Sequence, residues 1–207
     1  MPSANQAREN LVKYIENNIP NFQIVSKKES TLIKMLSFLL FFNKQFMTRY
    51  VTTIYPRVYV PSIPWHISNN SEIEILAHEY VHLADRKRLG LFFNFIYLSP
   101  QILSVLSLGA FWNLWFLLFL LFLLPIPSPG RAWAEFRGYR MSMAVMYWTT
   151  GQKININFLL DQFTKSGYYW MWPFRKQLKL KFEKEYDNIK KDILAPELQE
   201  IKKIIRG

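Results

Sequence analysis

The chain contains no cysteine, and this absence excludes several kinds of site at once. Without thiols there can be no disulfide scaffold, zinc ribbon, iron–sulfur cluster or cysteine nucleophile. Glycine is also scarce, with 7 residues, and proline is no more than average, with 11. Because 50% of the residues are hydrophobic, this composition excludes a disordered or low-complexity chain. The length of 207 residues predicts a single domain over 1–207 with its own hydrophobic core.

Acidic residues are in short supply, because 15 Asp and Glu stand against 26 Lys and Arg and give a formal charge of +11. Such a surface attracts nucleic acid, anionic lipid or an acidic partner. The basic residues are spread along the chain without a recognition motif, so we expect no nucleic-acid partner. Residues 174–207 form a basic helical segment preceded by Trp170 and Trp172. This arrangement suits an anionic membrane surface, and an ordinary solvated helix fits it equally well.

The middle of the chain lacks charge altogether, since no Asp, Glu, Lys or Arg occurs between Arg88 and Arg131. A membrane-spanning helix needs about 20 apolar residues, so this stretch has room for one long span or two short ones. We expect an inserted hairpin over 91–124, with helical arms at about 91–108 and 110–124 that turn near Gly109. Three prolines follow the second arm and end it, because proline cannot continue the helical hydrogen bonds.

Basic residues flank both ends of this hairpin, at 86–88 before it and at 131, 137 and 140 after it. Because basic residues favour the cytoplasmic side of a membrane, both ends are expected there, which requires an even number of spans. The first thirty residues contain no apolar core of a signal peptide, so we expect none. The pattern is compatible with a transmembrane hairpin, with a re-entrant hairpin and with a hairpin buried in a soluble protein.

Hydrophobic periodicity predicts a mainly α chain with a small β element. The β-branched and aromatic segment Tyr50–Pro61 predicts a short β hairpin or an edge strand. Ser71 and Glu74 have the spacing of a capping box and predict the start of a helix that runs to about Arg88. The other expected helices are 1–20, a core helix over Ser30–Met47, Ala132–Tyr147, Asn157–Lys165, Arg175–Ile193 and a last one from Pro196 to Arg206.

His78, Glu79 and His82 form the pattern HExxH within the helix that begins at Ser71. Positions i and i+4 share one helical face, so two imidazoles can bind one Zn²⁺. Glu79 lies beside them, where it can take a proton from a zinc-bound water and pass it to the leaving amine. The motif predicts a catalytic zinc site; the alternative is a pair of structural histidines near a surface.

A catalytic zinc of this kind needs a third protein ligand and an open position for water. The remaining histidine, His66, precedes the motif in a loop and is an unusual ligand, which leaves carboxylates. Glu135 is the best candidate, because small and aromatic residues flank it on an expected helix. The alternative is an exposed Glu135 that pairs with Arg131 or Arg137. Asp161 is a weaker candidate for the ligand.

The order of HExxH, hydrophobic hairpin and Glu-bearing helix resembles the gluzincins, and most of all the membrane-bound M48 metallopeptidase family, over about residues 45–150. The resemblance implies a zincin-like α+β fold in which His78, His82 and Glu135 bind zinc and Glu79 is the catalytic base. It also implies that Tyr50–Pro61 binds a peptide or protein substrate in extended form.

The family places an Asp four residues after the ligand Glu, where it orients a zinc histidine, but this chain has Tyr139 there. Asp85 is the candidate substitute for that orienting role. A donor that stabilises the oxyanion is also expected, with Tyr139, Tyr168 and Tyr169 as candidates, although tyrosines at such positions also serve in packing.

These observations predict a membrane-anchored zinc metallopeptidase that hydrolyses peptide bonds on the cytoplasmic side of a membrane. The alternative is a non-catalytic membrane-interaction protein, such as a small viral or bacterial membrane component, that retains a zincin-like fold. The motifs do not specify the substrate, because specificity depends on pockets that no motif encodes.

Overall fold

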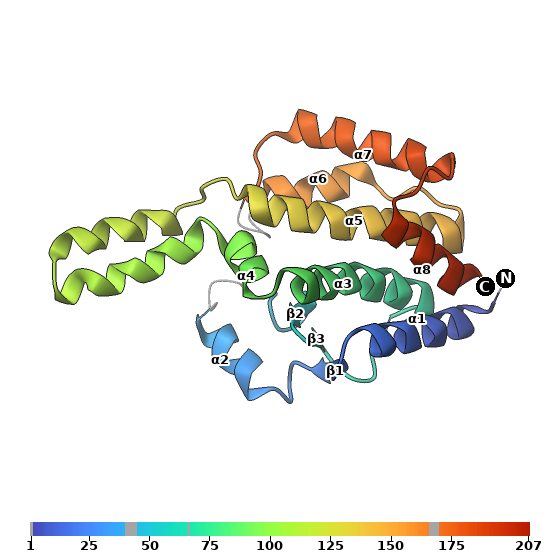
Figure 1. Cartoon of the computed structure of the whole chain (residues 1–207), viewed down its shortest axis with the longest axis horizontal. Coiled ribbons are helices and arrows are strands. Elements are labelled where there is room, and N and C mark those ends of the chain that lie inside the picture. Colours follow the sequence, from blue (N-terminus) through green and yellow to red (C-terminus); the bar gives the residue numbers. More distant parts are fainter. Residues whose placement is uncertain (1, 40–44, 66, 166–169) are drawn as a thin grey trace.

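The computed structural model describes residues 2–39, 45–65, 67–165 and 170–207, and within them the chain is mainly helical with one small sheet. A body of packed helices carries a long apolar hairpin at one end, and both termini lie at the other end (Figure 1). The α-helices are α1 (Ala4–Asn18), α2 (Thr31–Leu39), α3 (Asn69–Leu89), α4 (Leu91–Leu98), α5 (Pro129–Thr150), α6 (Ile156–Thr164), α7 (Arg175–Lys190) and α8 (Pro196–Arg206). Two 3₁₀ helices, η1 (Gln101–Phe111) and η2 (Leu114–Leu123), form the hairpin, and the strands are β1 (Gln23–Ser26), β2 (Thr52–Ile54) and β3 (Arg57–Val60).

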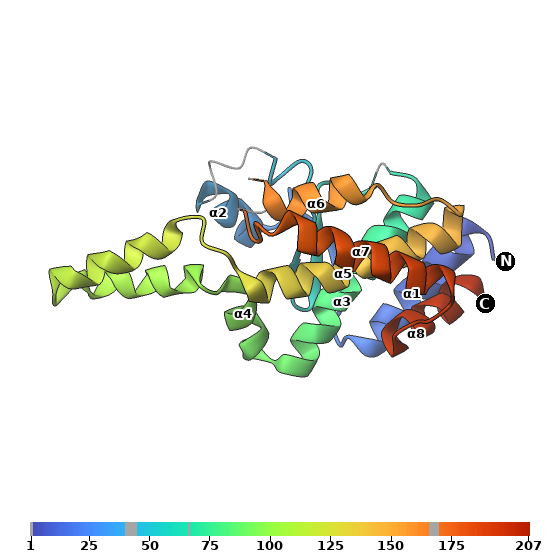
Figure 2. The same ribbon diagram turned by 90° about the horizontal axis from the view of Figure 1, so that it is seen from above.

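Helices α3 and α5 form the centre of the body and pack along each other. Helix α1 covers α3 from one side, while α6 and α7 cover α5 from the other (Figures 1 and 2). The core between these layers is apolar: Leu11 and Ile15 of α1 are fully buried, and the rings of Phe163 and Phe182 meet at 5.7 Å between α6 and α7. This arrangement brings the HExxH helix against the helix that carries Glu135.

Capping residues, glycines and a proline determine where the two central helices, α3 and α5, begin and end. Helix α3 begins one turn earlier than expected, because Ser68 rather than Ser71 is its N-cap and accepts a hydrogen bond from the Ser71 N–H at 3.3 Å. It ends at Gly90, whose φ of 59° is a conformation that favours glycine. Helix α5 has a proline in its first turn and stops at the left-handed Gly151.

The sheet has the strand order β1-β3-β2, with β1 parallel and β2 antiparallel to β3. The expected β hairpin within Tyr50–Pro61 is confirmed, because β2 and β3 are joined by a tight turn at Tyr55 and Pro56. Strand β3 is nevertheless the central strand rather than an edge strand, since β1, which the sequence did not predict, pairs with its other side. Strands β1 and β2 are the two edge strands, and β2 lies against α3.

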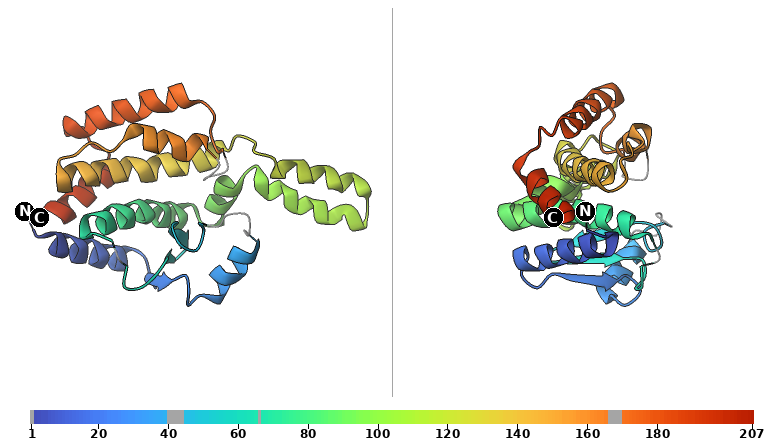
Figure 3. Two further views of the ribbon diagram at one scale, coloured as in Figure 1. Left: turned by 180° about the vertical axis from the view of Figure 1, so that it is seen from behind. Right: turned by 90° about the vertical axis from the view of Figure 1, so that its right-hand side faces the viewer.

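The charge-free segment forms a hairpin, but its first arm is not one continuous helix. Helix α4 stays on the body, and the chain then bends by 92° into η1 (Figure 3). Within the part of the chain that the structure describes, no single helix is long and apolar enough to cross a membrane, and α4 with η1 meets both requirements only as a bent pair. The expected arm at 91–108 is therefore broken after Leu98.

The hairpin turns at Trp112 and Asn113 rather than near Gly109. Asn113 makes the turn because its side chain caps η2 and accepts a hydrogen bond from the Trp115 N–H at 2.9 Å. Gly109 has another role, since a Cβ there would lie 2.5 Å from Cδ1 of Phe116 on the facing arm. Its missing side chain lets the two arms approach closely.

The expectation of a core helix over Ser30–Met47 is wrong for the residues that can be described. Helix α2 is described from Thr31 to Leu39, residues 40–44 lie outside the described part, and residues 45–49 form turns instead of a helix. The helix buries Ile33 but leaves Leu32, Met35 and Phe38 exposed, because only one of its faces meets the sheet. The other expected helices are confirmed with end points that differ by a few residues.

Candidate metal centre

Two helices bring together the three residues that the sequence predicted as metal ligands. His78 and His82 lie one turn apart on α3, and their Nε2 atoms are 3.1 Å from each other. From α5, Glu135 places Oε2 3.6 Å from Nε2 of His78 and Oε1 3.8 Å from Nε2 of His82. One ligand atom from each residue lies within 4.8 Å of the others, so the three can hold a metal ion.

The close approach of α5 to α3 depends on a glycine. A Cβ at Gly138 would lie 2.5 Å from Nε2 of His78, closer than side chains can pack. Gly138 follows Glu135 by three residues, and Ser142 follows it by seven, so all three lie on the face of α5 that meets α3. This face is therefore shaped around His78.

Further side chains orient the ligands. Nδ1 of His78 lies 3.3 Å from Oγ of Ser142, and the Tyr97 hydroxyl donates a hydrogen bond of 2.6 Å to Oε1 of Glu135. Such partners fix the ring of a ligating histidine and the plane of a ligating carboxylate. The ring of Tyr139 packs edge-on against His78, with a centroid distance of 4.8 Å.

The chemistry of the two imidazoles and the Glu135 carboxylate fits a metal ion. Among the described residues, Oε2 of Glu135 is buried without a hydrogen-bond partner, which is costly for a carboxylate. The nearest nitrogens belong to two imidazoles whose Nε2 atoms face each other. A divalent cation bound between these atoms satisfies all of them, and two histidines with one carboxylate are a common ligand set for zinc. Other transition metals also accept this set.

The pKa shifts at the cluster favour metal binding for Glu135 and His82 and oppose it for His78. Burial raises the pKa of Glu135, but the close contact with His78, the charges of both histidines and the hydrogen bond from Tyr97 outweigh it and lower that pKa to about 2. Burial lowers the pKa of His82 below its usual value. The pKa of His78 is raised, because its burial is outweighed by the contact of 3.6 Å with the Glu135 carboxylate and by the charges of Glu135 and Glu79. An ionised carboxylate and an unprotonated imidazole are the forms that bind metals.

Glu79, the predicted base, follows His78 directly on α3, and its side chain contacts strand β2. Its Oε2 accepts a hydrogen bond of 2.6 Å from the Thr53 hydroxyl on the edge strand β2. It does not belong to the three-residue group, as the motif implies for a base that acts beside the metal without binding it. Its catalytic role stays a prediction.

Two expectations about neighbouring residues are wrong. Asp85 does not orient a histidine, because its carboxylate accepts hydrogen bonds from Arg137 at 2.9 and 3.2 Å and from Arg88 at 3.4 Å. Asp161 is not part of the cluster, since it pairs with Lys165 and Arg175. The alternative of an exposed Glu135 is also wrong, because its exposed fraction is 2%.

Some relevant residues fall outside the described part of the chain, and others were missed. His66, Tyr168 and Tyr169 lie outside it, so their predicted roles stay predictions. Gly138 and Ser142 were missed, although their spacing from Glu135 on one helix could have indicated them. No sequence pattern indicated Tyr97, because its contact with Glu135 depends on how α4 folds back on the body.

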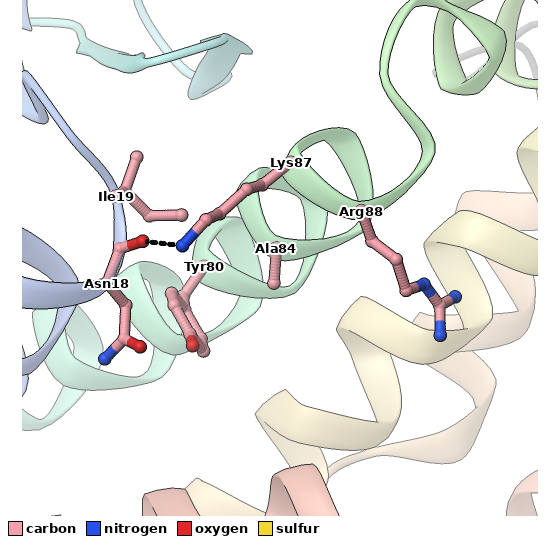
Figure 4. Close-up of a pocket in the computed structure, with 6 residues that line it drawn as sticks. All are labelled: Asn18, Ile19, Tyr80, Ala84, Lys87 and Arg88. Atoms are coloured by element: carbon pink, nitrogen blue, oxygen red, sulfur yellow. Dashed lines mark hydrogen bonds between the residues drawn. The ribbon is translucent and has the colours of Figure 1, made fainter.

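Two surface cavities lie apart from the cluster. The first, of about 270 Å³, is on the opposite face of α3 and is lined by Asn18, Ile19, Tyr80, Ala84, Lys87 and Arg88 (Figure 4). Lys87 crosses it to donate a hydrogen bond of 2.6 Å to the Asn18 carbonyl. The second, of about 350 Å³, lies between the start of α6 and α7. Neither cavity includes a residue of the metal group.

Comparisons of the chain with family models, with curated proteins and with solved structures gave no match. The case for a metal centre therefore rests on the geometry of His78, His82 and Glu135.

Proposed function

We propose that the protein is a zinc-dependent metallopeptidase of the gluzincin type, attached to a membrane by its apolar hairpin. The observation that carries the proposal is the buried group of His78, His82 and Glu135 with Glu79 on the same helix as both histidines. The two histidines of the motif meet a buried carboxylate from another helix, as a metal site requires. Two histidines with a purely structural role would not need this third residue. The order of these elements along the chain is that of the family it resembles.

Each residue has a defined task in this proposal. His78, His82 and Glu135 hold the metal, and zinc when bound supplies a Lewis acid that polarises a water or a carbonyl. Glu79 accepts the proton of the attacking water and delivers it to the amine that leaves. Thr53 holds one oxygen of the Glu79 carboxylate and so limits its rotation. The edge strand β2 has an unpaired side among the described strands, along which an extended peptide fits.

Attachment to a membrane is supported by the apolar surface at one end of the molecule. The hairpin tip exposes Phe111 and Trp112, at 90% and 87% of their surfaces. Helix α2, whose Phe38 is 80% exposed, lies at the same end of the body (Figures 1 and 2). The exposed Trp170 belongs to the segment that meets the base of the hairpin, where Met171 accepts a hydrogen bond from the Ser128 N–H. A tryptophan at the base of the hairpin, such as Trp170, suits the membrane interface.

The dimensions of the hairpin favour embedding in one face of a bilayer. Its arms contain 11 and 10 residues. At a rise of about 2.0 Å per residue in a 3₁₀ helix, each arm is roughly 20 Å long, whereas the hydrocarbon core is about 30 Å thick. Both ends of the hairpin then stay on the side of the metal centre, which we propose is the cytoplasmic side. The basic chain favours anionic lipid there.

Metal analysis combined with one substitution tests the peptidase proposal. The purified protein is expected to contain about one zinc per chain, and Glu79→Gln to keep the zinc while losing hydrolysis of a peptide library. Glu16→Gln, at an exposed position on α1, is the matched control and is expected to keep both. Zinc binding that survives the combined His78→Ala and His82→Ala substitutions would contradict the proposed site.

A second candidate is a membrane-associated protein in which the metal has a structural role. It is favoured by the burial of all three ligand side chains and by the position of α4 over the cluster. In that case the metal stabilises the fold, Glu79→Gln has no effect on any function of the protein, and substitution of a ligand lowers the melting temperature. Hydrolysis by the native protein that is lost in Glu79→Gln would exclude this candidate.

A further inference from the structure

Helix α4 lies directly over the group formed by His78, His82 and Glu135. Phe93 and Tyr97 are one turn apart on it, and their ring centroids lie 6.4 and 6.1 Å from that of His82. The Tyr97 hydroxyl reaches past the histidine and donates its hydrogen bond of 2.6 Å to Glu135. The proposed hydrolysis uses neither ring, so this contact calls for another explanation.

The position of Tyr97 is fixed by the start of α5. Nε of Arg131 donates a hydrogen bond of 3.2 Å to the Tyr97 carbonyl, and the Arg131 guanidinium lies 5.4 Å from the centre of the Tyr97 ring. At Gly130 the two helices approach so closely that a Cβ would collide with the carbonyl of Ile96. The backbone of α4 is therefore held by two neighbouring contacts with the first turn of α5, and these fix the location of Tyr97.

The same helix is the base of the apolar hairpin. The chain bends by 92° just after α4 and enters η1. On the return side, the Ser128 hydroxyl donates a hydrogen bond to the Ser99 carbonyl, so both ends of the hairpin are joined next to Tyr97. A shift of the hairpin base would move the Tyr97 hydroxyl relative to Glu135.

We propose that Tyr97 is a positioning residue that holds Glu135 in the orientation that binds metal. Through Tyr97, the position of the hairpin base then affects the metal centre. A hydroxyl that donates to a carboxylate makes a strong, directional hydrogen bond. With one oxygen of Glu135 held by Tyr97, the other faces His78. The proposal rests on the metal centre and is independent of peptidase activity.

The experiment measures zinc affinity of the full chain by competition with a chromophoric chelator. Tyr97→Phe removes the hydroxyl and keeps the ring that packs on His82. We expect zinc affinity to fall about 10-fold to 100-fold, the usual effect of removing a partner of a metal ligand. Tyr147→Phe, at the far end of α5 where the ring packs on Tyr186, is the matched control and is expected to leave the affinity unchanged.

Two more measurements separate positioning from general loss of structure. The absorption spectrum of the cobalt-loaded protein reports ligand geometry, and we expect it to change in Tyr97→Phe while the circular dichroism of the metal-free protein does not. Arg131→Met removes the hydrogen bond that seats α4 but no metal ligand, and we expect a smaller loss of zinc affinity.

The outcomes are distinct. If the native protein binds no zinc, the metal centre itself is wrong. If it binds zinc and Tyr97→Phe matches it in affinity and cobalt spectrum, the role of Tyr97 is overturned while the metal centre stands. Equal losses in Tyr97→Phe and Tyr147→Phe also overturn it. An unchanged affinity in Arg131→Met overturns the link to the hairpin base alone.

Discussion

Thr53 on the edge strand and Glu79 on the motif helix are joined by a hydrogen bond of 2.6 Å from the hydroxyl to the carboxylate. The two residues come from different layers of the fold, since β2 belongs to the sheet and α3 to the helical body. Whatever binds along β2 is therefore next to the residue that we propose as the base. The bond also gives the Glu79 carboxylate one preferred orientation.

Substitution of Thr53 tests this relationship. In Thr53→Val the shape is kept and the donor is lost, so the base is less well oriented. A hydrogen bond to a charged group contributes about 1.5–3 kcal/mol, so kcat of the proposed hydrolysis is expected to fall roughly 10-fold to 100-fold with little change in KM. Thr53→Ser keeps a hydroxyl and should restore most of kcat. A change confined to KM in Thr53→Val would indicate a role in substrate binding instead.

Gly138→Ala distinguishes helix propensity from the packing of the metal centre. Alanine stabilises a helix interior by about 1 kcal/mol relative to glycine. At this position the added Cβ would lie 2.5 Å from Nε2 of His78, so α3 and α5 must separate or the imidazole must move. We expect a lower melting temperature and at least 10-fold weaker zinc binding, measured by thermal unfolding and chelator competition. A more stable variant with native zinc affinity would show that the helices tolerate the methyl group.

Lys27 predicts an unusual pH dependence of stability. Its side chain is fully buried, and its Nζ donates a hydrogen bond of 2.6 Å to the Phe46 carbonyl. Burial lowers the pKa of Lys27 to about 8, against a smaller opposite effect from the charge of Glu79. Between pH 8 and its ordinary pKa of 10.5, the folded protein has released this proton while the unfolded chain retains it. The free energy of unfolding gains a contribution that rises with pH across this window.

Urea unfolding across that pH window measures the contribution. The control is Lys27→Met, which keeps the length of the side chain and cannot titrate. We expect the difference in unfolding free energy between the native protein and Lys27→Met to shift in favour of the native protein as the pH rises. A constant difference would mean that Lys27 has an ordinary pKa in the folded protein.

The tip of the hairpin is expected to insert into lipid. The combined Phe111→Ser and Trp112→Ser substitutions remove two highly exposed aromatic side chains. Burial of each such side chain contributes about 1.5–3 kcal/mol, so binding to vesicles that contain anionic lipid should weaken more than 10-fold. Ile193→Ser, between α7 and α8 at the end of the body away from the hairpin, is the control and should bind normally. Vesicle flotation provides the measurement, and equal binding by all three proteins contradicts insertion of the tip.

The sequence predicted the metal ligands because each signal was local or compositional. The spacing of His78 and His82 is a property of one helix, and the apolar surroundings of Glu135 are visible along the chain. The hairpin was equally visible, since the absence of charge needs no knowledge of the fold. These features depend on short stretches of residues, and the structure brings the three predicted ligands together.

What the sequence did not predict depends on contacts between distant segments. Strand β1 has only four residues, and its parallel pairing with β3 joins positions more than thirty residues apart, such as Gln23 and Arg57. Helix α2 looked like core because it is apolar, yet the fold covers one of its faces only. The contact between Tyr97 and Glu135 requires the break after α4, which periodicity cannot reveal.

The hairpin leaves the body after α4, which follows α3, and rejoins it at the start of α5. Helices α3 and α5 pack on each other along their lengths. A protease that cuts one peptide bond in η1 or η2 would therefore divide the chain without dividing the core. The two fragments would remain a noncovalent pair. A metal ion bound by His82 from one fragment and Glu135 from the other would crosslink them reversibly. Nicked protein would stay assembled in zinc and come apart more readily in a chelator.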